Sequence, residues 1–356
     1  MHAFVENARR GRIKTAFIRG ANPVFDAPDV LRAEEAFQNI PFKVSFANFM
    51  DETTAMADVV LPMHSYLEDW GTHIAANHGD EPVLGIQQPL MEPIYKTTRG
   101  FGDTLLNMIK ANGDSRFAQF DDYYAYLSAA ISTLPAEAHH EKESGTALWS
   151  AALQRGQIRL KAMRRRFSVN LAKADVTLPG RDERGDFPFH YLPNARLGMW
   201  DGRHANIPWL QEAPDQIAKV VWGSWVEMHP KAAKRLGVKN GDFVEVESEQ
   251  GSLEAQVYIH KGIHPEAVSV PLGQGHSEYG RYAKGRGVNP MKIINPGNEE
   301  HTHELAMFGT TVNVRPTGRH EVLVHLGASE SQMGRKIVAT ITADKLRRTE
   351  GGKHVA

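Results

Sequence analysis

The hydrophobic pattern changes at Val220, and this change restricts the possible folds more than any other feature of the sequence. Residues 10–110 alternate between short β-rich runs and helical patterns, whereas short runs with a period of two follow one another after Val220. The first pattern is typical of a parallel, doubly wound sheet, and the second of a closed barrel with one small helix. The expected fold class is therefore α/β, a partial doubly wound parallel sheet followed by a C-terminal β-barrel domain.

The first part of the chain contains β-rich runs separated by helical segments. The predicted strands are Ile13–Ile18, Phe42–Phe46 and Val59–Leu61. A helix is predicted over Pro28–Asn39, because its apolar residues share one face and proline suits a first turn. Asp51–Ala57 is predicted to form a short helix, since acids and hydroxyls at its start can accept from free N–H groups.

The middle of the chain is less regular. Helices are predicted over Tyr123–Leu134 and Ala147–Leu153, and the basic run Arg164–Arg166 is expected on a solvated helix face or a docking contact. A stretch rich in Pro, Gly and Asp, 178–214, is expected to be a long connection that wraps another surface, because so long a structureless loop is unusual inside one compact domain.

The last part is predicted to be mainly β. A short helix is expected over His229–Gly237, with proline in its first turn and glycine just past its end. The predicted strands are Asp242–Ser248, Ser252–Ile259, Ala267–Pro271, Thr311–Val314, Glu321–Leu326 and Lys336–Ile341. We expect an α/β domain at 1–110, a helical and irregular connecting region at 111–219, a barrel at 220–342 and a tail at 343–356.

Composition excludes several kinds of site. The chain has no cysteine, so it cannot hold a disulfide or a thiolate-bound iron–sulfur cluster. Its formal net charge is -1, and no nucleic-acid partner is expected from so balanced a charge. No apolar run reaches about 20 residues and the N-terminus has no apolar leader, so we expect neither a membrane span nor an export signal on this chain.

The histidines and paired acids give no clear catalytic or metal site. The closest histidine pairs, His139-His140 and His301-x-His303, lack helical spacing and nearby carboxylates, so no metal site is expected. Asp51-Glu52 and Glu68-Asp69 are adjacent acids whose side chains diverge. We interpret them as charges at helix starts, and we name no catalytic residue.

Polar loops follow each predicted strand of the first part. They are Gly20–Pro23, Asn48–Thr54 and Met63–Thr72. Ligands of open α/β sheets bind outside the carboxyl ends of the strands. Asn22 offers an amide, Thr53 and Thr54 offer hydroxyls, and a helix start offers N–H groups to a phosphate. Turn and capping roles explain the same residues, and spacing alone does not decide between the two.

A glycine-rich segment, 273–290, is the second candidate. It holds five glycines within 15 residues, beside His276, Arg281 and Asn289. Glycine permits a close approach between backbone and ligand, and arginine and asparagine supply directional donors. The segment is neither a Walker loop nor a dinucleotide fingerprint. A surface loop is the alternative.

Together these motifs resemble the C-terminal half of a molybdopterin (bis-guanine-dinucleotide) oxidoreductase of the dimethyl-sulfoxide-reductase superfamily. The first-part motifs that carry the resemblance are Gly20-Ala-Asn22-Pro23, Asp51–Pro62 and Glu68-Asp-Trp-Gly-Thr72. His229-Pro and Leu236–Asp242 resemble the start of that family's C-terminal barrel, which is of the double-psi type. The similarity covers residues 10–110 and 185–342.

A narrower resemblance points to one branch of this family. The segments that carry it are Leu192-Pro, Asp201–Glu212, Trp222–Pro230, Gly275–Pro290, Gln87–Leu90 and Phe101–Asp103. They are similar to the molybdopterin-like subunits of membrane-bound, quinone-linked complexes, including alternative complex III and menaquinone reductase complexes. Some members of this branch keep the fold and have lost the pterin and the metal.

The resemblance implies a cofactor and its contacts. The cofactor is molybdopterin guanine dinucleotide, and the implied binding residues are Asn22, Pro23, Thr53, Thr54, Asp58, Gly275, His276, Tyr279, Arg281 and Asn289. Asn22 and Asn289 would bond the pterin or guanine edge. Thr53 would face the pyrophosphate, and Arg281 would neutralise a phosphate or pair with an acid across the domain boundary.

The resemblance also implies partners. These are an N-terminal half or subunit with an iron–sulfur cluster, a ferredoxin-like iron–sulfur subunit and an integral membrane quinone-binding subunit. The complex would be peripheral to the membrane, on its periplasmic face. We do not expect this chain alone to be a competent redox enzyme. It either closes one side of a working pterin pocket or serves as a non-catalytic scaffold whose pocket is empty.

Overall fold

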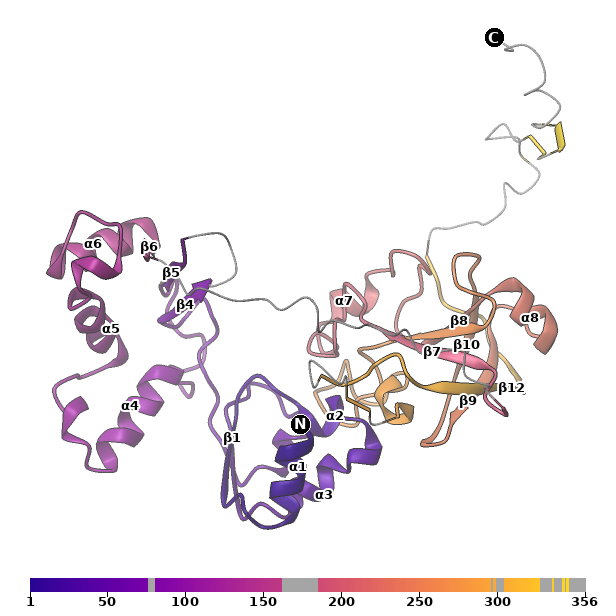
Figure 1. Ribbon diagram of the computed structural model, residues 1–356, viewed down its shortest axis with the longest axis horizontal. Helices are drawn as coiled ribbons and strands as arrows, with labels where there is room; N and C mark the ends of the chain where they lie inside the picture. Colours follow the sequence, from indigo (N-terminus) through magenta and orange to yellow (C-terminus); the bar gives the residue numbers. More distant parts are fainter. Residues whose placement is uncertain are drawn as a thin grey trace, which may run out of the picture.

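The computed structural model describes residues 1–75, 81–161, 185–295, 297–298, 304–326, 335, 341–342 and 344–345. Its strands form a small parallel sheet, an antiparallel sheet in a mainly helical lobe, and a closed barrel (Figure 1). The basic run 164–166, the pair His301 and His303, nearly all of the predicted strand 336–341 and most of the expected tail lie outside the described residues.

The parallel sheet confirms the predicted strands of the first part. It contains β1 (Thr15–Ile18), β2 (Phe42–Ser45) and β3 (Val59–Val60), in that order, with both neighbouring pairs parallel. Helices α1 (His2–Arg9) and α3 (Ala33–Gln38) pack on one face through a shared apolar core. The loops at the carboxyl ends of β1 and β2 therefore open toward the same edge of the sheet.

The helices of this part are shorter than predicted. Over Pro28–Asn39 the chain forms a 3₁₀ turn, η1 (Asp29–Leu31), and then α3, with Arg32 between them at φ 49°. The Arg32 amide closes the turn on the Asp29 carbonyl at 2.8 Å, and the break lets Leu31 and Phe37 enter the same core. The predicted helix over 51–57 is likewise only a 3₁₀ turn, η2 (Thr54–Met56).

A mainly helical lobe follows the parallel sheet. It contains the antiparallel strands β4 (Gly71–Ala75), β5 (Val83–Gln87) and β6 (Gln157–Arg159), and the helices α4 (Phe101–Ala111), α5 (Tyr123–Ser132) and α6 (Gly145–Arg155). Helices α5 and α6 confirm the two predicted helices. The sheet was not predicted, because β6 has only three residues and pairs with a strand 70 residues earlier.

The barrel confirms the predicted β-barrel of the last part. Its closed order is β10-β8-β11-β7-β12-β9. The strands are β7 (Phe189–Asn194), β8 (Trp225–Met228), β9 (Asp242–Ser248), β10 (Gly251–Ile259), β11 (Ala267–Pro271) and β12 (Thr311–His320). Helix α8 (Pro230–Leu236) ends at Gly237, whose φ of 71° closes it as predicted. A second short helix, α7 (Pro208–Glu212), precedes β8.

Two strands of the barrel differ from the prediction. β7 lies in the stretch that we expected to be a connection, and its internal Pro193 is the reason, since proline inside a run argues against a strand. The predicted strand 321–326 is wrong, because β12 already ends at His320. Only an isolated bridge between His325 and Val220 follows it, and Val322 and Val324 are exposed. In the part of the chain that the structure describes, no helix is long and apolar enough to cross a membrane.

Candidate functional site

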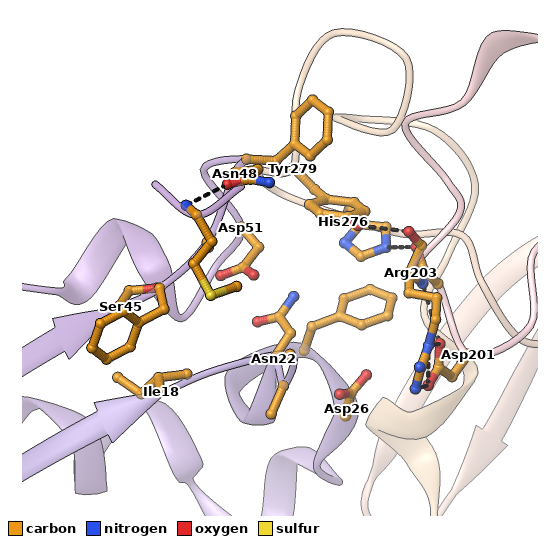
Figure 2. Close-up of a pocket in the computed structure, with 18 residues that line it drawn as sticks. Ile18, Asn22, Asp26, Ser45, Asn48, Asp51, Asp201, Arg203, His276 and Tyr279 are labelled. Carbon is orange, nitrogen blue, oxygen red and sulfur yellow. Dashed lines mark hydrogen bonds and ion pairs between the residues drawn. The ribbon is translucent and has the colours of Figure 1, made fainter. Parts of the chain in front are cut away.

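A cavity of about 240 Å³ lies where the carboxyl edge of the parallel sheet meets loops of the barrel (Figure 2). Asn22 and Asp26 reach it from the sheet side, and Asp201, Arg203 and His276 reach it from the barrel side. Three of the loops singled out in the sequence, those at Asn22, at 48–54 and at 273–290, therefore meet at one place, although more than 200 residues separate the first from the last.

Glu52 is the centre of this junction. It is 8% exposed, and its carboxylate accepts hydrogen bonds from the Asn22 amide (2.7 Å), the Ser277 amide (2.8 Å) and the Glu278 amide (3.1 Å). His276 Nδ1 lies 3.2 Å from each carboxylate oxygen. Burial alone would raise the pKa of Glu52, but the hydrogen bonds from His276, Asn22 and Glu278 lower it to about 2.

The His276 ring lies between two hydrogen-bond acceptors. Its Nδ1 faces the Glu52 carboxylate, and its Nε2 lies 3.2 Å from the Gly202 carbonyl oxygen. Both neighbours are acceptors, and only the imidazolium form can donate from both ring nitrogens. The ring is 3% exposed and stacks on Phe25, with centroids 3.7 Å apart. A buried contact between a histidine ring and a carboxylate therefore joins the barrel to the sheet.

Asn22 and the two threonines form a second network beneath Glu52. The Thr53 amide and hydroxyl both donate to the Asn22 side-chain oxygen, at 3.1 and 2.7 Å. The hydroxyls of Thr54 and Ser45 are 2.8 Å apart, and the Thr54 amide donates to Asp51 at 2.6 Å. Both threonines are fully buried. Their polar groups therefore bond within the protein, so these residues fix the loops that surround the cavity.

The glycine-rich segment is fixed to the sheet in the same way. Gly275 has a φ of 93°, and a Cβ there would lie 2.1 Å from the Asn289 amide nitrogen, so only glycine fits. The buried Asn289 side chain donates to the Phe25 carbonyl at 2.8 Å. The Tyr279 amide donates to the Met50 carbonyl, and its hydroxyl to the Arg203 carbonyl, both at 2.6 Å.

Three carboxyl groups line the cavity, Asp26 and Asp51 from the sheet side and Asp201 from the barrel side. Burial, reinforced by the nearby charge of Asp201, raises the pKa of Asp26 to about 7. Burial opposes ionisation of Asp201 as well, but hydrogen bonds from Arg203, at 2.9 and 2.6 Å, lower the pKa of Asp201. Burial also raises the pKa of Asp51. Of these three groups, Asp201 is thus held ionised, and Asp26 changes charge near neutral pH.

Other predicted residues lie away from this cavity. The Arg281 guanidinium is exposed, stacks on the ring of Tyr282 and donates to its hydroxyl at 2.6 Å. Asp58 is exposed and pairs with Lys43 at 3.1 Å, between β2 and β3. Pro23 is buried at the start of α2 (Pro23–Asp26). Gly275 and Asn289 line a separate cavity of about 520 Å³ on the other side of Glu52.

The sequence interpretation missed the residues with the most demanding environments. Glu52 was set aside as a helix-start charge, and Asp26, Asp201 and Arg203 had no role. A usable signal existed for Asp201 and Arg203, because they lie in a segment with a motif resemblance and no predicted secondary structure. Nothing in the local sequence marks Asp26, since its environment comes from the barrel.

The cavity fits one end of the implied cofactor better than the other. In the described ranges no group of three or more His, Cys, Asp or Glu residues could hold a metal ion. The carboxyl groups of Asp26 and Asp201, with the aromatic rings of Phe25 and Tyr279, suit a flat ring that carries N–H donors. The lining guanidinium, Arg203, is already paired with Asp201, and 240 Å³ is below the usual volume of a ligand pocket. The residues therefore fit a pterin or guanine ring, and not a pyrophosphate.

Two family models match the chain. Residues 1–96 match the molybdopterin oxidoreductase model, and residues 196–303 match the molydopterin dinucleotide binding domain model. The first match ends in the helical lobe, and the second covers the barrel loops that reach the cavity. The two units that meet at Glu52 thus match models of one kind of oxidoreductase.

Curated relatives agree with these models. The menaquinone reductase, molybdopterin-binding-like subunit of Nitratidesulfovibrio vulgaris is 26% identical over 85% of this chain and 41% of its own length. The arsenate respiratory reductase molybdopterin-containing subunit of a Shewanella species is 24% identical over 78% of this chain and 41% of its own length. The chain therefore spans about two fifths of the length of these relatives.

A solved structure has the same fold. Acetylene hydratase from Pelobacter acetylenicus superposes with a TM-score of 0.62, covering 88% of this chain and 46% of that one, at 14% identity. At this identity the similarity shows a shared fold. The two family models and the curated relatives together show that this chain belongs to the molybdopterin oxidoreductase family.

Proposed function

We propose that this chain forms one side of a molybdopterin guanine dinucleotide site in a quinone-linked electron-transfer complex. The observation that carries the proposal is the junction at Glu52, where loops of the sheet and of the barrel enclose one cavity. The two units match models of one oxidoreductase family. A ligand that both units bind best explains the cavity that they share.

Asp26 and Asp201 would hold the ring end of the group by accepting from its N–H donors, and Tyr279 would cover the ring. Glu52, His276 and Asn22 would hold the loops at the right separation, with Thr53 and Asn289 as supports. When bound with molybdenum, the group supplies two-electron oxidation or reduction. The protein's part is to bind and orient it.

The length and the name of a relative support the proposal that this chain works with partner subunits. The chain spans about two fifths of the relatives, and it has no cysteine for an iron–sulfur cluster. We propose that a further part, with an N-terminal half or subunit that holds such a cluster, completes the site. A ferredoxin-like subunit and a membrane-embedded quinone-binding subunit would pass the electrons, which places the complex at the membrane surface.

Pterin and molybdenum content of the assembly purified from its native host tests this proposal. We expect a pterin that becomes fluorescent on oxidation, with guanine nucleotide released in proportion. Asp201→Asn should lower the pterin content about tenfold or more, since a charged hydrogen bond contributes about 1.5–3 kcal/mol. Asp114→Asn is the matched control, because Asp114 pairs with Arg116 on the surface of the helical lobe.

The second candidate function is a scaffold whose pocket is empty. One observation favours it: Asn22, Thr53, Glu52 and His276 satisfy one another without a ligand. An assembly that contains the partner subunits but neither pterin nor molybdenum would support this second function and contradict the first.

A further inference from the structure

One face of the parallel sheet is uncovered, and it lies apart from the cavity. Residues that pair in register share a face, so Phe17, Val44 and Val59 point to one side of the sheet. Phe42 lies two residues before Val44 on β2, so its side chain points to the same side of the sheet. We call these four residues the open face. Helices α1 and α3 cover the opposite face, whose buried core includes Ala16 and Ile18 (Figure 1).

The open face is apolar, and three of its four residues are accessible. Phe17 is 55% exposed, Phe42 44% and Val59 36%, whereas Val44, on the central strand, is 4% exposed. Parallel sheets of α/β proteins are normally covered by helices on both faces, because their crossover connections run above and below the strands. Among the described residues, helices therefore cover only one of the two faces of this sheet.

The open face continues into a larger cavity beside it. The Phe17 ring stacks on Phe46 with centroids 6.2 Å apart, and Phe46 meets Phe101 edge to face at 5.1 Å. Phe101 and Leu105, both on α4, line a cavity of about 740 Å³ with Arg19. The Arg19 guanidinium lies 4.2 Å from the centre of the Phe101 ring. Over the described residues it forms no ion pair with an acid.

We propose that the open face is the docking surface for an amphipathic helix, from the part of the oxidoreductase that lies outside these 356 residues. The proposal rests on the proposed function, since it takes the partner to be another part of the same enzyme. The matches cover 41% of each of two relatives, and an enzyme of their length would have ample further sequence to supply the helix.

The geometry defines the helix. A four-residue strand spans about 13 Å, which a helix of about nine residues matches. Its apolar face would cover Phe17 and Val59, and an acidic side chain at one end would pair with Arg19. A helix that enters over Arg19 would also close the mouth of the neighbouring cavity.

Site-specific photo-crosslinking in the native host tests the proposal. Phe17 and Val59 are replaced, one at a time, by p-benzoylphenylalanine, and the cross-linked peptides of the purified assembly are identified by mass spectrometry. Phe308 is the matched control, because it is 64% exposed on a loop of the barrel. Phe17→Glu and Phe308→Glu are compared for recovery of the assembly.

Cross-links from positions 17 and 59 should reach one segment with helical apolar spacing in a molybdopterin oxidoreductase sequence outside this chain, and those from position 308 should not. Phe17→Glu should lower recovery at least fivefold, and Phe308→Glu should leave it unchanged. Cross-links to a second copy, cross-links to a membrane-spanning subunit, or none at all would overturn the proposal. An assembly without pterin would contradict the proposed function while leaving this cross-link map intact.

Discussion

The role of Glu52 depends on its three-dimensional environment, which the local sequence does not show. In the sequence it follows another acid, at the start of a predicted helix. In the fold, Asn22 and two amides of the glycine-rich segment surround it, together with the His276 ring. These donors come from three separate segments, so no local pattern could have identified it. His276 stays a predicted ligand contact, since it lines the cavity, and its ring nitrogens lie 3.2 Å from Glu52 and from the Gly202 carbonyl.

Glu52→Gln should destabilise the chain by about 2–4 kcal/mol, because it removes a buried carboxylate that accepts hydrogen bonds from three separate segments. Denaturant unfolding at pH 7 measures the loss. Glu278→Gln is the control: Glu278 pairs with Lys284 at 2.9 Å on the surface, and such pairs contribute less than about 1 kcal/mol. Equal effects of the two substitutions would contradict the role given to Glu52.

Asp26 predicts a pH dependence of opposite sign to that of Glu52. The pKa of Asp26 is raised from 3.8 to about 7, so folding favours its protonated form. Its contribution to stability is complete below pH 3.8 and is lost as the pH rises to about 7. The contribution of Glu52, whose pKa is lowered from 4.5 to about 2, is instead present above pH 4.5 and lost as the pH falls toward 2.

Asp26→Asn should therefore remove a decline in unfolding free energy, on the order of 2–4 kcal/mol, that the unmodified chain shows between about pH 4 and 7. Denaturant unfolding at a series of pH values measures it. Parallel stability curves for the two proteins over this range would show that Asp26 does not retain its proton in the fold.

At the scale of elements, the glycine-rich segment depends on backbone conformation more than on its polar side chains. Gly275 and Gly285 both have positive φ, 93° and 71°, but only at Gly275 would a Cβ meet other atoms. Gly275→Ala should cost more than 2 kcal/mol and displace the segment from the sheet. Gly285→Ala should cost about 1 kcal/mol, from backbone strain alone. Thermal unfolding compares the two, and a smaller loss at Gly275 would contradict the close packing against Asn289.

Elements that could be predicted are those whose pattern is local. The hairpin of β9 and β10 alternates between apolar and polar residues over most of its length, and helix α8 has proline at its start and glycine at its end, so both were found close to their true bounds. β6 and β7 were missed, because a three-residue strand and a strand with an internal proline are defined by their partners. The left-handed Arg32 that divides the predicted helix has no sequence signal either.

The candidate site was predictable to the level of its loops. Strand ends and glycine spacing located the segments around Asn22, Thr53 and Gly275, which the fold brings together. The same signals could not say which side chains face the cavity, because burial and bonding across the junction decide it. Arg281 is the clearest example, since its guanidinium stacks on its own neighbour.

At the scale of the whole molecule, the uncovered sheet face should make the isolated chain associate weakly. Phe17, Phe42 and Val59 are each roughly half-exposed, so covering them would contribute about 3 kcal/mol, too little for a stable dimer. Sedimentation velocity should show association that rises with concentration and is reduced by Phe17→Glu. Phe308→Glu is the control. A chain that stays monomeric at all concentrations would count against an uncovered face.

We propose above all that the sheet and the barrel of this molybdopterin oxidoreductase chain bind one ligand between them, at the Glu52 junction. The most direct measurement is an electron cryo-microscopy map of the assembly purified from its native host, at a resolution that separates ring systems from side chains. We predict a flat, ring-shaped density between Asp26 and Asp201, next to Tyr279. A cavity filled by a protein side chain, or a pterin bound elsewhere in the assembly, would contradict it.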